Sequence, residues 1–127
     1  MKSTGYVMLF GFLIAGIGCA AYEPIRMSMT PNPIAKNEAT LVEGEKLYVN
    51  YCSACHGELG LGDGVVGREL SVKPANLTQI KWKSDGLLAM NIQNGRGLMP
   101  AWKGILSEEE IWILVEYIRH LPVKNAE

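Results

Sequence analysis

The sequence predicts a small all-α domain of three or more helices. Two segments repeat apolar side chains at helical spacing. One lies within residues 41–51, and the clearer one places Ile111, Leu114, Val115 and Ile118 at i, i+3, i+4 and i+7. No segment alternates convincingly between apolar and polar residues, the pattern of a half-buried strand.

Length, charge and cysteine content limit the classes of protein that fit. The chain has 127 residues, a length that favours one domain, and its formal net charge is −1. A nucleic-acid partner is therefore not expected, because such binding requires a strongly basic face. The sequence contains three cysteines, an odd number, so a simple framework of paired disulfides does not fit.

The first helix of the domain is expected to begin near Thr40. Thr40 and Glu43 have the spacing of a capping box, in which the hydroxyl and the carboxylate each satisfy an N–H group at the helix end. This helix should run directly into Cys52. Residues 57–80 are rich in glycine and predict a long loop, which is unusual in a compact domain unless the loop has a function.

A short helix is expected after this loop. Ser84 or Asp85 can cap its start, and the Asn94-Gly95 pair is typical of a helix end. An apolar stripe lies between these two signals, so the helix should pack one face against the core.

The last helix is expected to start at a second capping box, formed by Ser107 and Glu110, and to stop before Pro122. Three glutamates in its first turn suit the positive end of the helix dipole. The domain should therefore occupy residues 40–123, followed by a short tail over 124–127.

The N-terminal segment has the composition of an export signal. Lys2 is the only charged residue before an apolar run over residues 5–21. Cys19 lies near the end of this run, and the site resembles the lipobox of bacterial lipoproteins, where a signal is cut just before a cysteine that carries lipid. We therefore expect an export signal over residues 1–18 and a lipidated Cys19. An uncleaved membrane anchor and ordinary cleavage one or two residues later remain alternatives.

Residues 19–39 have the composition of a linker. They contain three prolines among polar and charged residues, without sustained periodicity. We expect a flexible segment that joins the N-terminal anchor to the domain.

The sequence Cys52-Ser53-Ala54-Cys55-His56 has the C-x-x-C-H pattern of a c-type haem attachment site. Each thiol adds to one vinyl group of the haem, and this spacing on a helical turn places both sulfurs on one side. His56 follows at once, and a neutral imidazole is a good fifth ligand for iron. One covalent haem c is therefore predicted. A zinc site, a thioredoxin-like dithiol and a structural disulfide are the alternatives.

Met99 is the candidate for the sixth iron ligand. It lies in a loop between two predicted helices, far from His56 in sequence, so the two side chains can approach the haem from opposite faces. A methionine ligand raises the reduction potential relative to two histidines. Met90 is the rival ligand, but its helix should direct it into the core. A gas-binding or peroxidase protein would leave this position open.

Trp82 and Trp102 are candidates for the haem environment. An indole N–H can donate a hydrogen bond to a haem propionate, although packing in the core would explain either side chain equally well. His120 is expected at a helix end in contact with solvent.

Residues from about Thr40 to Pro122 resemble class I c-type cytochromes, especially the small bacterial mono-haem group. The matching stretches are GEKLYVNYCSACHG, KPANLT, IQNGRGLMPAW and LSEEEIWILVEYIRHLP. The resemblance implies a cytochrome c fold around one haem, with His56 as the proximal ligand and Met99 as the distal one. It also implies that Pro74 lies near the proximal side of the haem, and that Gly44 and Tyr48 pack against Tyr117.

The expected function is one-electron transfer in a respiratory-type chain, without catalysis of its own. The carrier would be tethered on the periplasmic or cell-surface side of a bacterial membrane and would exchange electrons with redox partner proteins. The alternative is a fixed mono-haem subunit of a larger membrane-bound oxidoreductase. Basic residues are concentrated between Arg68 and Lys103, which favours an acidic partner if this face docks.

Overall fold

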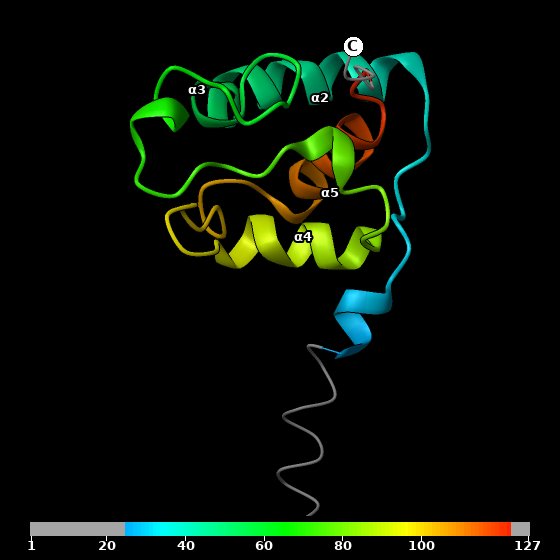
Figure 1. The fold of residues 1–127 in the computed structure, drawn as a ribbon. Coiled ribbons are helices and arrows are strands. Elements are labelled where there is room, and N and C mark those ends of the chain that lie inside the picture. Colours follow the sequence, from blue (N-terminus) through cyan, green and yellow to red (C-terminus); the bar gives the residue numbers. More distant parts are fainter. Residues whose placement is uncertain (1–24, 123–127) are drawn as a thin grey trace, which may run out of the picture.

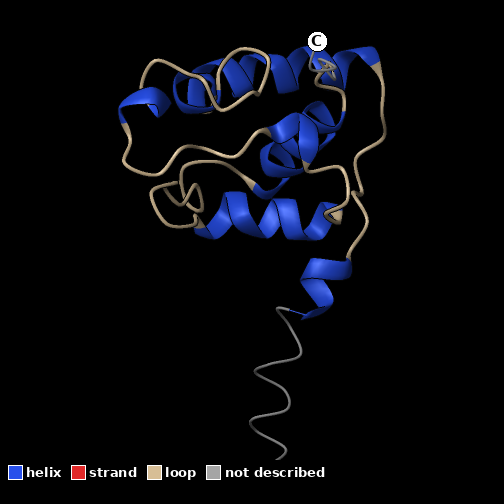
Figure 2. Ribbon diagram, in the orientation of Figure 1, coloured by secondary structure: helices blue, strands red, loops and turns tan. Residues whose placement is uncertain are grey.

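The computed structural model describes residues 25–122. The helices in chain order are α2 (Glu38–Tyr51), α3 (Ser53–His56), α4 (Asp85–Asn94) and α5 (Glu108–Arg119), with short 3-10 turns η1 (Gly67–Glu69) and η2 (Leu77–Gln79). A further helical turn covers residues 25–29. The all-α prediction is confirmed, since residues 25–122 contain no strand (Figure 2). The predicted export signal over 1–18, Cys19 and the tail over 124–127 lie outside the described residues.

Helix α5 is the centre of the fold, because it packs against both α2 and α4 (Figure 1). Its apolar stripe is buried as the spacing predicted, and the Ser107–Glu110 capping box is present at its start. The core of the described residues draws on all three longer helices: Leu47, Tyr48, Cys52, Leu77, Leu88, Ala89, Ile92, Leu106, Ile111, Trp112, Leu114, Val115, Ile118 and Leu121.

Helix α2 begins earlier than the sequence predicted. Asn37 is its N-cap: the residue has an extended backbone, with φ −153°, and its side chain accepts a hydrogen bond from the Thr40 N–H at 2.9 Å. The prediction that Thr40 and Glu43 form the capping box of this helix is therefore wrong. The Thr40 hydroxyl instead donates to the Ala35 carbonyl at 3.1 Å. Thr40 is already helical, so it cannot adopt the non-helical backbone of a cap.

Gly44 allows α2 to cross α5 closely. A Cβ atom at this position would lie 2.6 Å from Tyr117 Cβ and 3.2 Å from the Ile113 carbonyl oxygen. The neighbouring Tyr48 ring lies against Tyr117, with 5.3 Å between ring centroids. The expected packing of Gly44 and Tyr48 against Tyr117 is confirmed.

Helix α4 starts and ends where the sequence placed it. Ser84 caps it by accepting a hydrogen bond from the Leu87 N–H at 3.3 Å, and Gly95 ends it with φ 69°. That left-handed backbone favours glycine, since a side chain there is strained. Leu88, Ala89 and Ile92 form its buried face.

The segment before α2 lies against the domain. Met27 and Ile34 pack on the core, and Asn32 donates hydrogen bonds to α5. Part of the predicted linker is thus in contact with the folded body. Within residues 25–122, no helix is long and apolar enough to cross a membrane.

Candidate functional site

The C-x-x-C-H residues lie on the helical turn that follows α2. The Cys52 N–H donates to the Tyr48 carbonyl at 2.8 Å, and the His56 N–H donates to the Cys52 carbonyl at 2.9 Å. Cys52 is buried, Cys55 is half-buried, and both thiols are free. Burial, assisted by the nearby Cys55, raises the pKa of the Cys52 thiol to about 12. These helical hydrogen bonds therefore hold both thiols and the imidazole on one turn of helix.

His56 is oriented by a backbone carbonyl from the opposite loop. Its Nδ1 lies 3.1 Å from the Ala75 oxygen. A carbonyl only accepts hydrogen bonds, so Nδ1 carries the proton and Nε2 keeps its lone pair. Burial lowers the pKa of His56, and the bond to Ala75 partly opposes that change. The ring is thereby held neutral, with one nitrogen fixed and the other available as a ligand.

The loop after His56 folds back closely over α3. Gly64 and Gly67 contact its backbone: added Cβ atoms would lie 2.4 Å from the Ala54 oxygen and 2.1 Å from the Cys55 oxygen. The Cβ at Gly67 would also lie 2.8 Å from the Pro74 ring. Pro74 is therefore beside the Cys55 turn, on the segment that supplies Ala75. The glycines of this loop serve close packing of backbone on backbone.

Met99 lies in a tight loop fastened to the end of α4. Arg96 and Met99 exchange two backbone hydrogen bonds of 3.1 Å each. Beyond them, the Trp102 N–H donates to the Ile92 carbonyl at 3.1 Å, and Lys103 makes the equivalent bond to the next carbonyl of α4 at 3.0 Å. Met99 is half-buried against the core. The free carbonyls at the end of α4 thus fix the position of the methionine loop.

An aromatic contact joins the two parts of the site. The Tyr51 ring, next to Cys52, meets the Trp102 ring edge to face, with 5.2 Å between centroids. This pair connects the end of α2 to the methionine loop. The sequence analysis singled out Trp102 but missed Tyr51, whose position beside Cys52 was the available signal. It also missed the Ala75 carbonyl, since a backbone acceptor leaves no signal in sequence.

The other three candidates lie just before α4, on α4 and at the end of α5. Trp82 is 78% exposed, with the Lys83 ammonium 5.3 Å from its ring centroid. Met90 is half-buried on α4. His120 is exposed at the end of α5, where its Nδ1 lies 2.8 Å from the Glu116 carbonyl oxygen. The expectation of a solvated His120 is confirmed. Among residues 25–122, no group of three His, Cys, Asp or Glu side chains is placed to hold a metal ion.

The family model described as "Cytochrome C oxidase, cbb3-type, subunit III" matches residues 39–118, which include the whole of this site. The chain belongs to the c-type cytochrome family. The cytochrome is 32% identical to cytochrome c6 of Thermosynechococcus vestitus over 107 residues, covering 84% of this chain and 90% of the relative. It is 31% identical to cytochrome c-551 of Bacillus subtilis, covering 93% and 96%.

The cytochrome also matches parts of larger proteins. It is 35% identical to the Cbb3-type cytochrome c oxidase subunit CcoP of Azospirillum brasilense over 71% of its own length, but it spans only 31% of that protein. A chain of the Kuenenia stuttgartiensis reducing HAO-like protein complex Kustc0457/Kustc0458 has a similar structure, with a TM-score of 0.63 and 30% identity. That match covers 70% of the cytochrome and 46% of the other chain.

Members of this family are electron carriers that bind covalently attached haem c, and one haem is typical of a small domain. The relatives are periplasmic or exported proteins. The residues of this cytochrome fit such a group, because two free thiols and an oriented, neutral imidazole share one helical turn.

Proposed function

We propose that the chain is a one-electron carrier of a respiratory-type chain, with haem c attached at Cys52 and Cys55 and its iron ligated by His56 and Met99. The observation that carries this proposal is the hydrogen bond from His56 Nδ1 to the Ala75 carbonyl. It fixes the imidazole beside both thiols and leaves Nε2 as a donor atom. Bound haem supplies an iron that cycles between two oxidation states.

The protein's own residues would hold the haem and keep other molecules from binding its iron. Attachment would use the two free thiols: each would add across one vinyl double bond, with the thiol hydrogen passing to the other vinyl carbon, so that no oxidant or reductant would be consumed. Met99 would supply the second protein ligand to the iron, because its loop is hydrogen-bonded to α4 and joined to the Cys52 end of α2 through Tyr51 and Trp102. An iron held by both His56 and Met99 would offer oxygen or peroxide no free coordination position.

We assign the surrounding residues supporting roles. Pro74 packs beside the Cys55 turn, which is consistent with a place near the proximal side of the haem. Trp102 has its indole on the methionine loop, where it can contact the haem or donate to a propionate. Trp82 is a weaker candidate for the same role, because its ring is mostly exposed and lies against Lys83.

We further propose that residues 1–18 direct export, that Cys19 carries the lipid, and that the cytochrome domain begins at Asn37, the cap of α2, rather than at residue 40, and ends near residue 123. The carrier would then lie on the periplasmic or cell-surface side of a bacterial membrane. The apolar run that ends near Cys19 supports this assignment, as does the exported character of the relatives.

The spectrum of the exported protein and its variants tests the ligands. Met99→Leu should abolish the charge-transfer band between methionine sulfur and oxidised iron, whereas Met90→Leu, the matched control, should retain it. An intact mass including one haem and a lipid would support the attachment at Cys52 and Cys55 and the anchor at Cys19. A colourless mature protein, or a band lost only in Met90→Leu, would contradict the assignment.

A fixed subunit of a membrane oxidoreductase is the second candidate. The matching family model and the relative CcoP are both named for subunits of cbb3-type cytochrome c oxidase, which favours this alternative. Extraction in mild detergent followed by size-exclusion chromatography separates the two. A free small species supports the carrier, and a stable large complex supports the subunit.

A further inference from the structure

We propose that residues 27–34 form a strap that docks on the start of α4, the end remote from the methionine loop. The docked strap shortens the free chain between Cys19 and the domain, and so limits how far the domain can move from its anchor. This inference rests on the proposed function, because it concerns a domain anchored at Cys19. Two contacts carry it: the hydrogen bonds of Asn32, one of which goes to a carboxylate oriented by an ion pair, and the packing of the strap backbone on Gly86.

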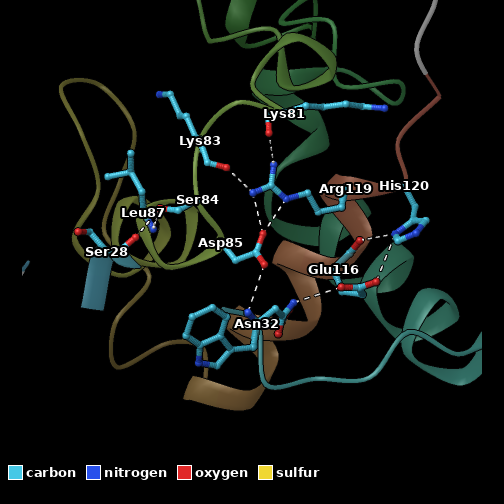
Figure 3. A network of polar contacts seen from close by, with 11 residues as sticks. Ser28, Asn32, Lys81, Lys83, Ser84, Asp85, Leu87, Glu116, Arg119 and His120 are labelled. Carbon is cyan, nitrogen blue, oxygen red and sulfur yellow. Dashed lines mark hydrogen bonds and ion pairs between the residues drawn. The ribbon is translucent and has the colours of Figure 1, made fainter. Parts of the chain in front are cut away.

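Asn32 joins the strap to both α4 and α5. Its backbone N–H donates to Asp85 Oδ2 at 3.2 Å, and its side-chain amide donates to the Trp112 carbonyl at 3.0 Å and to Glu116 Oε2 at 3.4 Å. The remaining side-chain oxygen accepts from the Ile34 N–H at 2.9 Å. Every hydrogen-bonding group of this side chain is therefore occupied, either within the strap or against the domain. Figure 3 shows the bonds of Asn32 to Asp85 and Glu116.

Asp85 is held in place for this contact. One of its oxygens accepts from Arg119 Nε at 2.7 Å while the other receives the Asn32 N–H (Figure 3). Arg119 also donates to the backbone carbonyls of Lys81 and Lys83. The Arg119–Asp85 ion pair is only partly exposed, so solvent screens it less than a surface pair. The strap thus docks on a carboxylate that the fold has already positioned.

Gly86 lets the strap backbone lie directly on the first turn of α4. A Cβ atom at this position would be 1.9 Å from the Met27 carbonyl oxygen and 3.0 Å from the Ser28 carbonyl carbon. These are backbone atoms, which cannot move away as a flexible side chain can. Ser84 adds a hydrogen bond from its hydroxyl to the Ser28 carbonyl. The absence of a side chain at position 86 is therefore a requirement for docking.

Docking limits the reach of the anchor. Cys19 precedes Met27 by eight residues, which span at most about 28 Å of extended chain. Release of the strap up to Asn37 would give eighteen residues and a limit of about 63 Å. The strap therefore reduces the greatest possible reach more than twofold, which favours partners held close to the membrane surface.

Docking also determines which side of the domain the anchor leaves free. The strap contacts the start of α4 at Asp85 and Gly86, and the methionine loop follows its end at Asn94. These ten residues separate the two ends by about 15 Å. In Figure 1, the strap lies on the right of the domain, whereas α3 and loop 95–106 lie on the left. The proposed haem site is thereby turned away from the anchored end.

Gly86→Ala tests the strap in the full-length, haem-loaded protein. Alanine favours helix, so α4 should be retained while the strap is displaced. Hydrogen exchange should show the hydrogen-bonded amides of the strap, Thr30, Asn32 and Ile34, protected in the wild type and exchanging at free-chain rates in the variant. Asn32→Ala should act in the same direction. Lys36→Ala, an exposed substitution without a hydrogen bond to lose among the described residues, is the control and should match the wild type.

Energy transfer from a fluorescent headgroup lipid to the haem measures the reach in vesicles. Efficiency should fall in Gly86→Ala and remain unchanged in Lys36→Ala. Free-chain exchange in the wild type, or equal transfer in all variants bound to vesicles, would overturn the proposal. Protection of the strap in a protein that fails to bind vesicles would refute the anchor of the proposed function, and the tether role with it, while supporting the docked contact.

Discussion

Gly44→Ala is the sharpest test of the helix crossing that positions the C-x-x-C-H segment. The added Cβ would lie 2.6 Å from Tyr117 Cβ and 3.2 Å from the Ile113 carbonyl oxygen, both well inside ordinary van der Waals contact. Neither atom is the far end of a flexible side chain. Relief therefore requires α2 and α5 to separate, which would also disturb the contact between the Tyr48 and Tyr117 rings.

The expected cost follows from two opposing terms. Overpacking a close contact of this kind costs about 1–3 kcal/mol. The higher helix propensity of alanine offsets up to about 1 kcal/mol of this loss in unfolding free energy. Because a separation of 2.6 Å between two Cβ atoms belongs to the severe end of this range, the net loss of unfolding free energy should be about 2 kcal/mol, which lowers the Tm of a domain of this size by at least about 8 °C.

Thermal unfolding of the haem-loaded protein, followed by circular dichroism, measures this loss. Asn50→Ala on the exposed face of α2 is the matched control, because it adds helix propensity without meeting another helix. Its Tm should equal or slightly exceed that of the wild type. An unchanged or raised Tm in Gly44→Ala would refute the close crossing inferred for α2 and α5.

Three further predictions concern the same scaffold. Tyr48→Phe removes the hydroxyl that donates to the buried Gly57 carbonyl at 2.7 Å and should cost about 1–3 kcal/mol in chemical unfolding; a loss near zero would mean that water replaces the bond. Asn37→Ala removes the cap of α2 and should cost about 1 kcal/mol, more than Thr40→Ala in the same assay; the reverse order would restore Thr40 as the cap. The pKa of Glu110 is lowered by its hydrogen bonds to the Ser107 backbone and side chain. The contribution of the Glu110 carboxylate to the unfolding free energy is therefore complete above its pKa in the unfolded chain and is lost as the pH falls through its pKa in the folded protein. Glu110→Gln should flatten this acid dependence of the unfolding free energy, and an unaltered pH profile would contradict the assignment.

The docked strap bears on the choice between a mobile carrier and a fixed subunit. A free linker favours a mobile carrier, whereas a docked strap limits the distance over which an anchored domain can search. Asn32 and Gly86 therefore bear on function although they are remote from the proposed haem ligands. Mutating them separates the reach of the carrier from its redox chemistry.

Local patterns predicted the helices well where one signal had no competitor. The Ser107–Glu110 capping box and Gly95 at the end of α4 were both correct. The start of α2 was missed because Asn37 and Thr40 are both good caps and lie within one turn of each other. Only the extended backbone at Asn37 decides between them, and that conformation is known from the structure alone.

The sequence alone determined the all-α fold and the order of Cys52, Cys55 and His56 on one helical turn, because both depend on spacing between near neighbours. Tertiary structure decided which carbonyl orients His56, nineteen residues away, and where Asn32 docks, eighty residues from its partner on α5. Such contacts join segments whose meeting depends on the packing of the whole core. A backbone oxygen or a missing Cβ offers no local pattern from which they could be predicted.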